Sequence, residues 1–335
     1  MSSAKKIVGY YGSWATYRNG NGQVKIDNIN PSLYTHIIYS FIGADVEGNV
    51  QVLDQNNDIT NGGLRNFINL KMKNPEVKLL VAMGGWNEGS EKYSQIMSSK
   101  CKRSRLVGSV INFVRTWGFD GFDLDWEYPK QRSDKENYIL FLKELRESSP
   151  RGFIISAAVG ADVSLISTAY DVKNMNKYLD FINLMTYDYH GSWEAVTGHN
   201  APFSCYDATV NNWIANGASP SKLILGIPVY GRTWSLSNPN SNAVGSPANG
   251  PGMAGPYSKE SGVLTYLEIC EEFKAHHWEK CWCVGENVPY AVRGNQWLSY
   301  DNEISVESKV KYLKNKNLGG AMLWSLDGDD IKGKS

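Results

Sequence analysis

Eight short apolar runs recur along the chain, and amphipathic stretches separate most of them. The runs are continuous and rich in Ile, Val and Leu, as expected for strands that are buried on both faces. They lie at 7–11, 35–41, 78–83, 121–126, 153–159, 181–185, 223–229 and 320–324. Helical patterns lie at 63–73, 104–117, 134–149, 174–179, 208–216 and 305–315. Gly118 follows one of them in the position of a C-cap. Eight such alternations predict an α/β fold, the TIM (β/α)8 barrel.

The connection between the seventh and eighth runs is too long for a barrel loop. It holds about ninety residues, and structureless loops of that length are rare. Residues 237–257 are rich in Gly, Pro, Asn and Ser and are interpreted as a loop, while 262–276 has a helical pattern and 291–300 an extended one. We therefore expect a small α+β insertion domain at 233–301, between strand 7 and helix 7. Residues 1–232 and 302–335 would form the catalytic barrel.

The balance of charges limits the classes of partner. The chain has 34 basic and 34 acidic residues, so its formal net charge is zero. Nucleic acids and acidic membranes need a basic surface and are not expected as partners. No apolar run reaches the roughly 18 residues of a membrane span. The 11 Trp, 19 Tyr and 10 Phe fit either core packing or a platform for flat, uncharged rings.

The five cysteines do not have the spacing of a zinc site. Their number is odd, so at most two disulfides can form, and the C-x-C pair at Cys281 and Cys283 lacks a second metal-like pair. No metal is therefore expected from these residues. The first residues, MSSAKK, contain no apolar segment, so no signal peptide is visible.

Three acids alternate in the fourth run: Asp123, Asp125 and Glu127, with Asp120 just before them. In a strand, alternate side chains point to the same face, so these three carboxyl groups would form one file. Like charges at such short range raise one another's pKa, so the file cannot stay fully ionised. Barrel active sites lie at the C-terminal ends of the strands, which places Glu127 outermost at that rim.

Aromatic and polar residues follow the other strands at the same rim. Aromatic residues that only pack the core would not concentrate at strand ends. This distribution therefore favours a surface that binds flat, uncharged rings of a ligand. The residues concerned are Tyr10, Phe41, Gly85, Trp86, Asn87, Met185, Tyr187, Asp188, Tyr230, Arg232, Met322 and Trp324.

The acid spacing at 120–127 resembles the DxxDxDxE signature of family 18 glycoside hydrolases, the chitinases and chitinase-like lectins. Residues 80–86 resemble the second motif of this family, with Ala82 where many members have Ser. The sequences MxYDxHG at 185–191 and GxPxYGR at 226–232 resemble its later motifs. The resemblance covers nearly the whole chain and is closest to animal, arthropod-like chitinases.

The resemblance implies hydrolysis of β-1,4-N-acetylglucosamine linkages by a retaining, substrate-assisted mechanism of the endochitinase type. The N-acetyl carbonyl of the −1 sugar would attack its own anomeric carbon and form an oxazolinium ion. Glu127 would protonate the leaving oxygen and then act as base on water. Asp125 would turn between Asp123 and Glu127 and accept the acetamide N–H, with Asp123 as the deeper negative charge. Tyr187 would donate to the acetamide oxygen.

The resemblance also implies a row of sugar-binding residues. Trp324 would form the floor under the −1 sugar, Trp14 and Trp86 would stack on other sugars, and Arg232 would bond sugar hydroxyls beside Asp188. The expected contacts at the barrel mouth also include Tyr10, Phe41, Gly85, Asn87, Tyr128, Met185, Tyr230 and Met322. Chitin or chito-oligosaccharide is the expected partner, without cofactor, nucleic acid or membrane. A secreted, extracellular monomer is expected.

Several residues also have structural interpretations. The acid file could bind a metal, but Mg²⁺ or Ca²⁺ ligands more often come with Asn or Gly in a loop. We expect structural roles for Asp120 and His190. The pair Gly84-Gly85 is expected to let the backbone turn rather than bind phosphate, because no Lys-Ser or Lys-Thr follows it.

Two other functions are compatible with the same acids. A chitin-binding lectin without catalysis usually replaces the final acid of the signature, whereas Glu127 is present here. An endoglycosidase acting on the chitobiose core of N-glycans would share the acid file. The insertion favours a deep chitin groove instead.

The resemblance implies further details of the backbone and the cysteines. Cis peptide bonds are expected at 40–41, 127–128 and 324–325. Gly9 and Tyr34 stand where many animal relatives have a disulfide, so this chain is expected to have lost both partners together. Cys270 is left free or paired with Cys281 or Cys283. These departures weaken the inference of an oxidising compartment.

Overall fold

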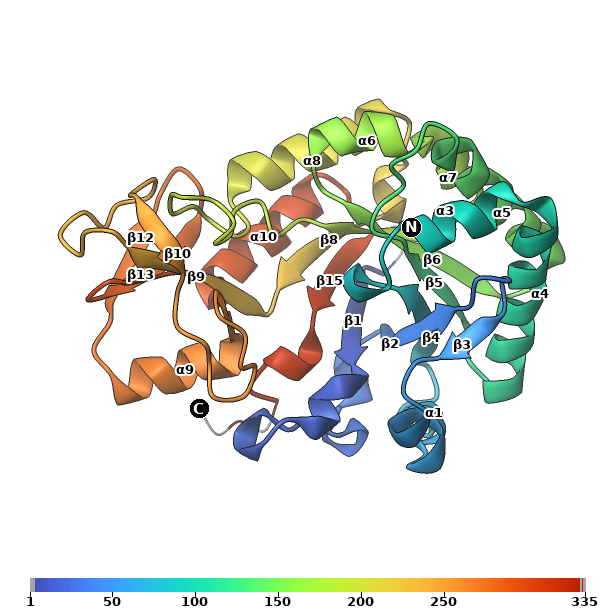
Figure 1. Cartoon of the computed structure of the whole chain (residues 1–335), viewed down its shortest axis with the longest axis horizontal. Helices are drawn as coiled ribbons and strands as arrows, with labels where there is room; N and C mark the ends of the chain where they lie inside the picture. Colours follow the sequence, from blue (N-terminus) through green and yellow to red (C-terminus); the bar gives the residue numbers. More distant parts are fainter. Residues whose placement is uncertain (1–3, 332, 334–335) are drawn as a thin grey trace.

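The barrel predicted from the sequence is confirmed. The computed structural model describes residues 4–331 and 333. Eight parallel strands run in the order β1-β15-β8-β7-β6-β5-β4-β2, and the pairing of β1 with β2 closes the barrel (Figure 1). All eight overlap the predicted runs. They are β1 (Lys6–Gly12), β2 (His36–Ala44), β4 (Lys78–Gly84), β5 (Gly121–Asp125), β6 (Ile154–Gly160), β7 (Phe181–Met185), β8 (Leu223–Pro228) and β15 (Gly320–Trp324). A short strand, β3 (Val50–Val52), pairs antiparallel with β2.

Helices alternate with these strands, and the six predicted ones are present with shifted ends. Residues 63–73 form two helices that meet at Asn69, and Gly118 is a left-handed C-cap as predicted. The short helices α3 and α6 were not predicted. The helices of the barrel are α1 (Gly63–Ile68), α2 (Leu70–Lys73), α3 (Glu91–Ser98), α4 (Lys100–Trp117), α5 (Asp134–Ser148), α6 (Val163–Ala169), α7 (Val172–Tyr178), α8 (Phe203–Ala215) and α10 (Glu303–Asn315).

A second, six-stranded sheet lies beside the barrel, at the left of Figure 1. Its central path is β10-β9-β14-β13-β12, and β11 pairs with β9. The elements are β9 (Tyr230–Leu236), β10 (Ala248–Pro251), β11 (Val263–Thr265), α9 (Tyr266–Ala275), β12 (Glu279–Cys283), β13 (Val288–Arg293) and β14 (Gln296–Ser299). The α+β insertion is therefore present, and we propose 233–301 as its limits.

Three predictions inside this insertion were wrong in detail. Residues 237–257, expected to be a loop, contain strand β10, and residues 291–300, expected to be extended, include the turn between β13 and β14. Strand β12 lies outside all the predicted elements. The predicted helix 262–276 begins as a strand, because a capping box starts α9 only after Thr265. The Thr265 hydroxyl accepts the Glu268 N–H at 3.3 Å, and the Glu268 carboxylate accepts the Thr265 N–H at 2.8 Å.

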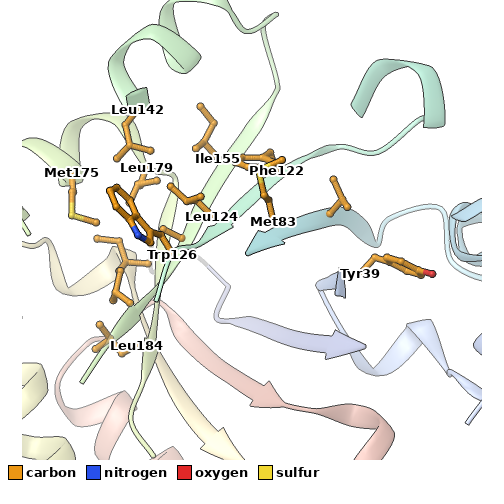
Figure 2. Packing of buried hydrophobic residues seen from close by; sticks show 14 of the residues in the cluster. Tyr39, Met83, Phe122, Leu124, Trp126, Leu142, Ile155, Met175, Leu179 and Leu184 are labelled. Carbon is orange, nitrogen blue, oxygen red and sulfur yellow. The ribbon is translucent and has the colours of Figure 1, made fainter. Parts of the chain in front are cut away.

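Strand β5 shows why the acids form a file. Phe122, Leu124 and Trp126 pack into the layer between strands and helices, so the alternating acids face the barrel interior. Figure 2 shows Trp126 within this cluster of buried apolar side chains, which also includes Leu142 of α5 and Met175 of α7. Burial of each large apolar side chain contributes about 2 kcal/mol. Packing of the apolar face thus stabilises β5, while the opposite face carries the acidic side chains.

Gly9 and Tyr34, where many animal relatives have a disulfide, lie close enough to agree with the loss of that bond. A Cβ atom added to Gly9 would lie 2.9 Å from the Tyr34 ring, so these two positions are adjacent and the Tyr34 ring fills the space between them. All five cysteines lie within the described residues, and none forms a disulfide there, including Cys270 with Cys281 or Cys283. Among residues 4–331 and 333, no helix is long and apolar enough to cross a membrane.

His199 lies in the loop after β7 and packs against the second sheet, where it is 3% exposed. Its ring centroid lies 5.9 Å from that of Tyr290 and 6.0 Å from that of Trp297, and neither ring nitrogen has a hydrogen-bond partner in the described part of the chain. Burial lowers the pKa of His199 from 6.5 to about 4. The unfolded chain therefore binds a proton between these pH values that the folded chain does not. Its contribution to stability is complete above pH 6.5 and is lost as the pH falls toward 4.

We expect His199→Phe to flatten the pH dependence of the unfolding free energy within this window, by up to about 3 kcal/mol. Denaturant unfolding of both proteins at several pH values measures the difference. His36, whose pKa burial also lowers to about 4, is present in both proteins and cancels. The exposed His277→Gln is the control. If the unfolding free energy depended on pH equally in wild type and His199→Phe, the lowered pKa of His199 would be contradicted.

Candidate active site

A cleft of about 1750 Å³ opens at the C-terminal ends of the barrel strands. This volume exceeds that of an ordinary small-molecule pocket and leaves room for several sugar rings. All the predicted site residues except Asp123 and Met322 line it. They are Tyr10, Trp14, Phe41, Gly85, Trp86, Asn87, Asp125, Glu127, Tyr128, Met185, Tyr187, Asp188, Tyr230, Arg232 and Trp324.

Asp123 lies below the cleft and is held by hydrogen bonds. The Tyr10 hydroxyl donates to its Oδ2 at 2.7 Å, while the Ser156 hydroxyl and the Asn183 amide donate to Oδ1 at 2.5 and 3.3 Å. Burial raises the pKa of Asp123 to about 6, although these hydrogen bonds favour the ionised form. Asp123 is thus a fixed carboxyl group with little freedom to turn.

Asp125 lies one step closer to the cleft and lacks such anchors. It is 3% exposed, and its Oδ1 atom has no hydrogen-bond partner among the described residues. Burial raises the pKa of Asp125 well above its usual value, and the negative charges of Glu127 and Asp123 raise it further. A buried acceptor without a partner is costly. Asp125 is therefore suited to accept a hydrogen bond from a ligand.

Glu127 is half-buried where the file meets the cleft. Burial raises the pKa of Glu127 to about 7, and the charge of Asp188 adds to this shift. Hydrogen bonds with the Tyr128 side chain and the Trp86 backbone oppose it. Near neutral pH, a substantial share of the molecules therefore holds a proton on a carboxyl group that faces the cleft. Such a group can act as a general acid and then as a base.

Ser90 forms hydrogen bonds with the residues on both sides of Glu127. The Trp126 indole N–H donates to the Ser90 hydroxyl at 2.8 Å, and this hydroxyl donates to the Tyr128 carbonyl oxygen. In the neighbouring strand, Gly84 lets the backbone of β4 approach that of β5 closely at Asp125. Gly84 has a φ of 113°, and a Cβ atom there would lie 2.1 Å from the Asp125 carbonyl oxygen. The pair Gly84-Gly85 thus allows an unusual backbone conformation, as expected.

We expect Ser90→Ala to lower kcat about tenfold while changing KM less, because Glu127 would be held less well after its neighbours lose their hydrogen bonds. Steady-state kinetics on a chito-oligosaccharide would measure this split. Ser98→Ala, which removes an exposed hydroxyl bonded to the Gln95 carbonyl oxygen, is the matched control. A purely structural role for Ser90 would lower stability without changing kcat per folded molecule.

Asp188 and its neighbours form one polar wall of the cleft. The Tyr230 hydroxyl donates to Asp188 Oδ1 at 2.7 Å, and Arg232 Nε donates to the same oxygen at 2.8 Å. Arg232 Nη2 lies 2.7 Å from this oxygen and completes the ion pair. Arg232 therefore has a protein partner, although sugar hydroxyls were its expected partners. The Tyr187 hydroxyl lies 4.0 Å from the sulfur of Met322, so Met322 supports this tyrosine from below the cleft.

A group of aromatic rings also lines the cleft. The centroid of Trp324 lies 5.4 Å from Tyr10 and 5.8 Å from Phe41, and Trp14 stacks on Phe41 at 6.1 Å with an interplanar angle of 17°. Trp14 is 42% and Trp86 72% exposed. Both indoles are therefore partly open to the cleft, and their role in stacking on sugars stays a prediction.

The comparisons with known proteins agree with this geometry. The profile of glycosyl hydrolases family 18 matches residues 6–329. The chain belongs to family 18. It is 39% identical to mouse chitotriosidase-1 over 99% of this chain and 75% of that protein. The crystal structure of the Ostrinia furnacalis Group IV chitinase in complex with allosamidin has a TM-score of 0.97 and 41% identity, covering 99% of this chain and 94% of that one. Human YKL-39, described as a pseudo-chitinase with retained chitooligosaccharide binding, has a TM-score of 0.92 and 38% identity, covering 99% and 95%.

Three backbone features expected from family 18 are present. The bonds Ser40–Phe41, Glu127–Tyr128 and Trp324–Ser325 are all cis. Asp120, the first acid of the family signature, lies at the opposite end of β5 from the cleft. Its Oδ2 accepts the Leu79 N–H at 2.7 Å and pairs with Lys71 at 2.8 Å, which is a structural role.

Sequence reasoning missed several residues of this family 18 site. Trp193 lines the cleft, is 61% exposed and lies 5.0 Å from the guanidinium of Arg232. It closely follows the strand-end motif at 185–191, and this position could have indicated it. Ser90, Ser156 and Asn183 carry no such signal, because only the fold brings them to the acid file. No cluster of His, Cys, Asp or Glu that could hold a metal ion occurs within residues 4–331 and 333.

Proposed function

We propose that this family 18 protein is a chitinase that hydrolyses β-1,4-linked N-acetylglucosamine with retention of configuration. The observation that carries the proposal is the state of Glu127. It is a carboxyl group with a pKa of about 7, in a cleft of about 1750 Å³ that is lined with aromatic rings. The endochitinase-type action and the assignment of the site residues are part of the proposal.

The file of acids supports a substrate-assisted mechanism. Glu127 protonates the leaving oxygen while the acetamide carbonyl of the −1 sugar attacks the anomeric carbon. Asp125 accepts the acetamide N–H and stabilises the positive oxazolinium ion, while the anchored Asp123 supplies further negative charge. The Tyr187 hydroxyl donates to the acetamide oxygen. Because the three acids titrate as a coupled set, their protons belong to the set rather than to single residues.

The walls of the cleft would position the sugars. Trp324, in the group of rings with Tyr10 and Phe41, forms the floor under the −1 sugar, and the exposed faces of Trp14, Trp86 and Trp193 stack on sugars to either side. The ion pair of Arg232 with Asp188 holds the polar wall. We further propose that the protein acts outside the cell as a monomer.

Oligosaccharide binding without catalysis is the second candidate, favoured by the likeness to the pseudo-chitinase YKL-39. A lectin would not need a titratable acid at the cleft. Glu127 is present here with a raised pKa, which supports the enzyme.

Hydrolysis of N-acetylglucosamine hexamers, followed by proton NMR of the new reducing ends, tests the proposal. We expect β-anomeric products first, and no cleavage of the fully deacetylated hexamer, which lacks the acetamide nucleophile. Calorimetric titration with the same hexamer is the parallel measurement. Binding without any cleavage would favour the lectin, and α-anomeric products would exclude the substrate-assisted route.

A further inference from the structure

Two tryptophans of the cleft come from opposite ends of the chain. Trp14 follows β1 and Trp324 ends β15, and these two strands pair in parallel (Figure 1). The ring centroids of Trp14 and Trp324 lie 6.3 Å apart, with an interplanar angle of 46°. Neighbouring sugars that stack on these two rings must follow this angle. The contacts that fix the angle therefore influence how well a chain of sugars fits the cleft.

Asp327 is bonded to both ends of the segment that carries Trp14. Its Oδ1 accepts the Gly12 N–H at 2.9 Å, and its Oδ2 lies 2.8 Å from Arg18 Nη2. Gly12 directly precedes the 3-10 turn Ser13–Tyr17, and Arg18 directly follows it. Arg18 Nη1 also donates to the Asp327 carbonyl oxygen at 2.8 Å. The Asp327 side chain is fully buried, so salt screens this ion pair only weakly.

The indole of Trp14 lies on the backbone that Asp327 binds. A Cβ atom on Gly12 would lie 2.6 Å from Trp14 Cζ2, so the ring covers Gly12 directly. Asp327 in turn follows Trp324 by three residues. The Trp324 carbonyl oxygen accepts the Val229 N–H at 2.8 Å, which holds this loop against the end of β8. One buried carboxylate thus connects the segments of both tryptophans.

We propose that Asp327 and Arg18 are positioning residues that hold Trp14 at a fixed angle to Trp324, and that they thereby determine the affinity for chito-oligosaccharides long enough to cover both rings. The identity of the ligand rests on the proposed function. Arg18 also lines the cleft, so direct contact of its guanidinium with a sugar is the competing explanation. The two explanations differ in whether Arg18 acts through Trp14.

A double-mutant cycle distinguishes them. Calorimetric titration with the N-acetylglucosamine hexamer is carried out on proteins that also carry Glu127→Gln, so that the ligand is not cleaved. Trp14→Ala should weaken binding at least about tenfold, because it removes a stacking surface. Arg18→Met should weaken it about fivefold, because one end of the Trp14 segment is released.

In the protein that lacks both side chains, Arg18→Met should add no further loss to that of Trp14→Ala. Arg18→Lys, which keeps the charge beside Asp327, should recover most of the affinity. An effect of Arg18→Met that persists in full without Trp14 would establish direct contact and overturn the proposal. Unchanged affinity in folded Arg18→Met would overturn it as well.

Arg146→Met is the matched control, because Arg146 makes a similar set of bonds outside the cleft lining. Its Nη2 lies 2.6 Å from Asp180 Oδ2 and donates to the Tyr178 carbonyl oxygen at 2.7 Å. This variant should lower stability and keep the hexamer affinity. The number of binding sites per chain in each titration reports the folded fraction, so partial unfolding is not mistaken for weaker binding.

Asp327→Asn is the second variant if Arg18→Met fails to fold. It keeps an oxygen for the Gly12 N–H, removes the ion pair and should weaken binding in the same direction, again only while Trp14 is present. Hydrolysis by the wild type tests the proposed function separately. A protein that binds the hexamer without cleaving it would contradict the chitinase, and the cycle would still decide the role of Arg18. A protein that does not bind the hexamer would contradict both proposals.

Discussion

Replacement of Glu127 by Gln is expected to lower kcat on chito-oligosaccharides by about 10³-fold or more, within the range spanned by general acid–base catalysis. Gln keeps the shape of the side chain and loses its titratable proton. No other acid lies beyond it in the file, since Asp123 is bonded below the cleft and Asp125 lies deeper. Binding of the hexamer should persist, because the stacking surfaces of Trp86 and Trp324 are unchanged. Single-turnover kinetics together with calorimetry would measure both quantities.

The control for this variant is Glu91→Gln, the same exchange at an exposed position in α3. It should hydrolyse the hexamer at the wild-type rate. Rapid hydrolysis by Glu127→Gln would show that another group protonates the leaving oxygen. Loss of binding in that variant would show instead that Glu127 holds the sugar, and would weaken its assignment as the acid.

The barrel and its acid file could be predicted from the sequence because both depend on local patterns. Continuous apolar runs identify strands buried on both faces, and alternation within β5 places Asp123, Asp125 and Glu127 on the inner face. The motifs shared with family 18 then indicated most of the predicted residues that line the cleft. The same patterns failed for α6, which has seven residues and starts at an N-cap, Asp162, whose carboxylate accepts the Ser164 N–H at 2.7 Å.

What could not be predicted depends on contacts between distant segments. Asn183 and Ser156 meet Asp123 from other strands, at sequence separations of 60 and 33 residues. Arg232 lines the cleft as expected, but its ion pair with Asp188, which accepts the Arg232 Nε–H, could not be predicted. A sequence shows that a polar side chain lies near a rim, but not which partner satisfies it. The anchoring of Asp123 and the missing partner of Asp125 therefore required the fold.

Asp125→Asn is expected to lower kcat by about 10²-fold, since it removes the negative charge that stabilises the oxazolinium ion. It should also shift the pH profile. Glu127 must be protonated to act as an acid, so activity falls as the pH rises through its pKa of about 7. The interaction between the two acids disfavours ionisation of the pair, and Asn removes it. The alkaline limb of kcat/KM should thus move to lower pH.

The matched control is Asp120→Asn, the same exchange at the far end of β5, where the carboxyl group pairs with Lys71. It should lower stability and leave the alkaline limb in place. Comparing the two variants separates the effect of the Asp125 charge on the pKa of Glu127 from the general effect of removing an acid from this strand. If Asp125→Asn kept the wild-type limb, Glu127 would owe its raised pKa to burial and to the charge of Asp188, without a contribution from Asp125. Asp125 would then act only on the acetamide, and the three carboxyl groups would not share their protons.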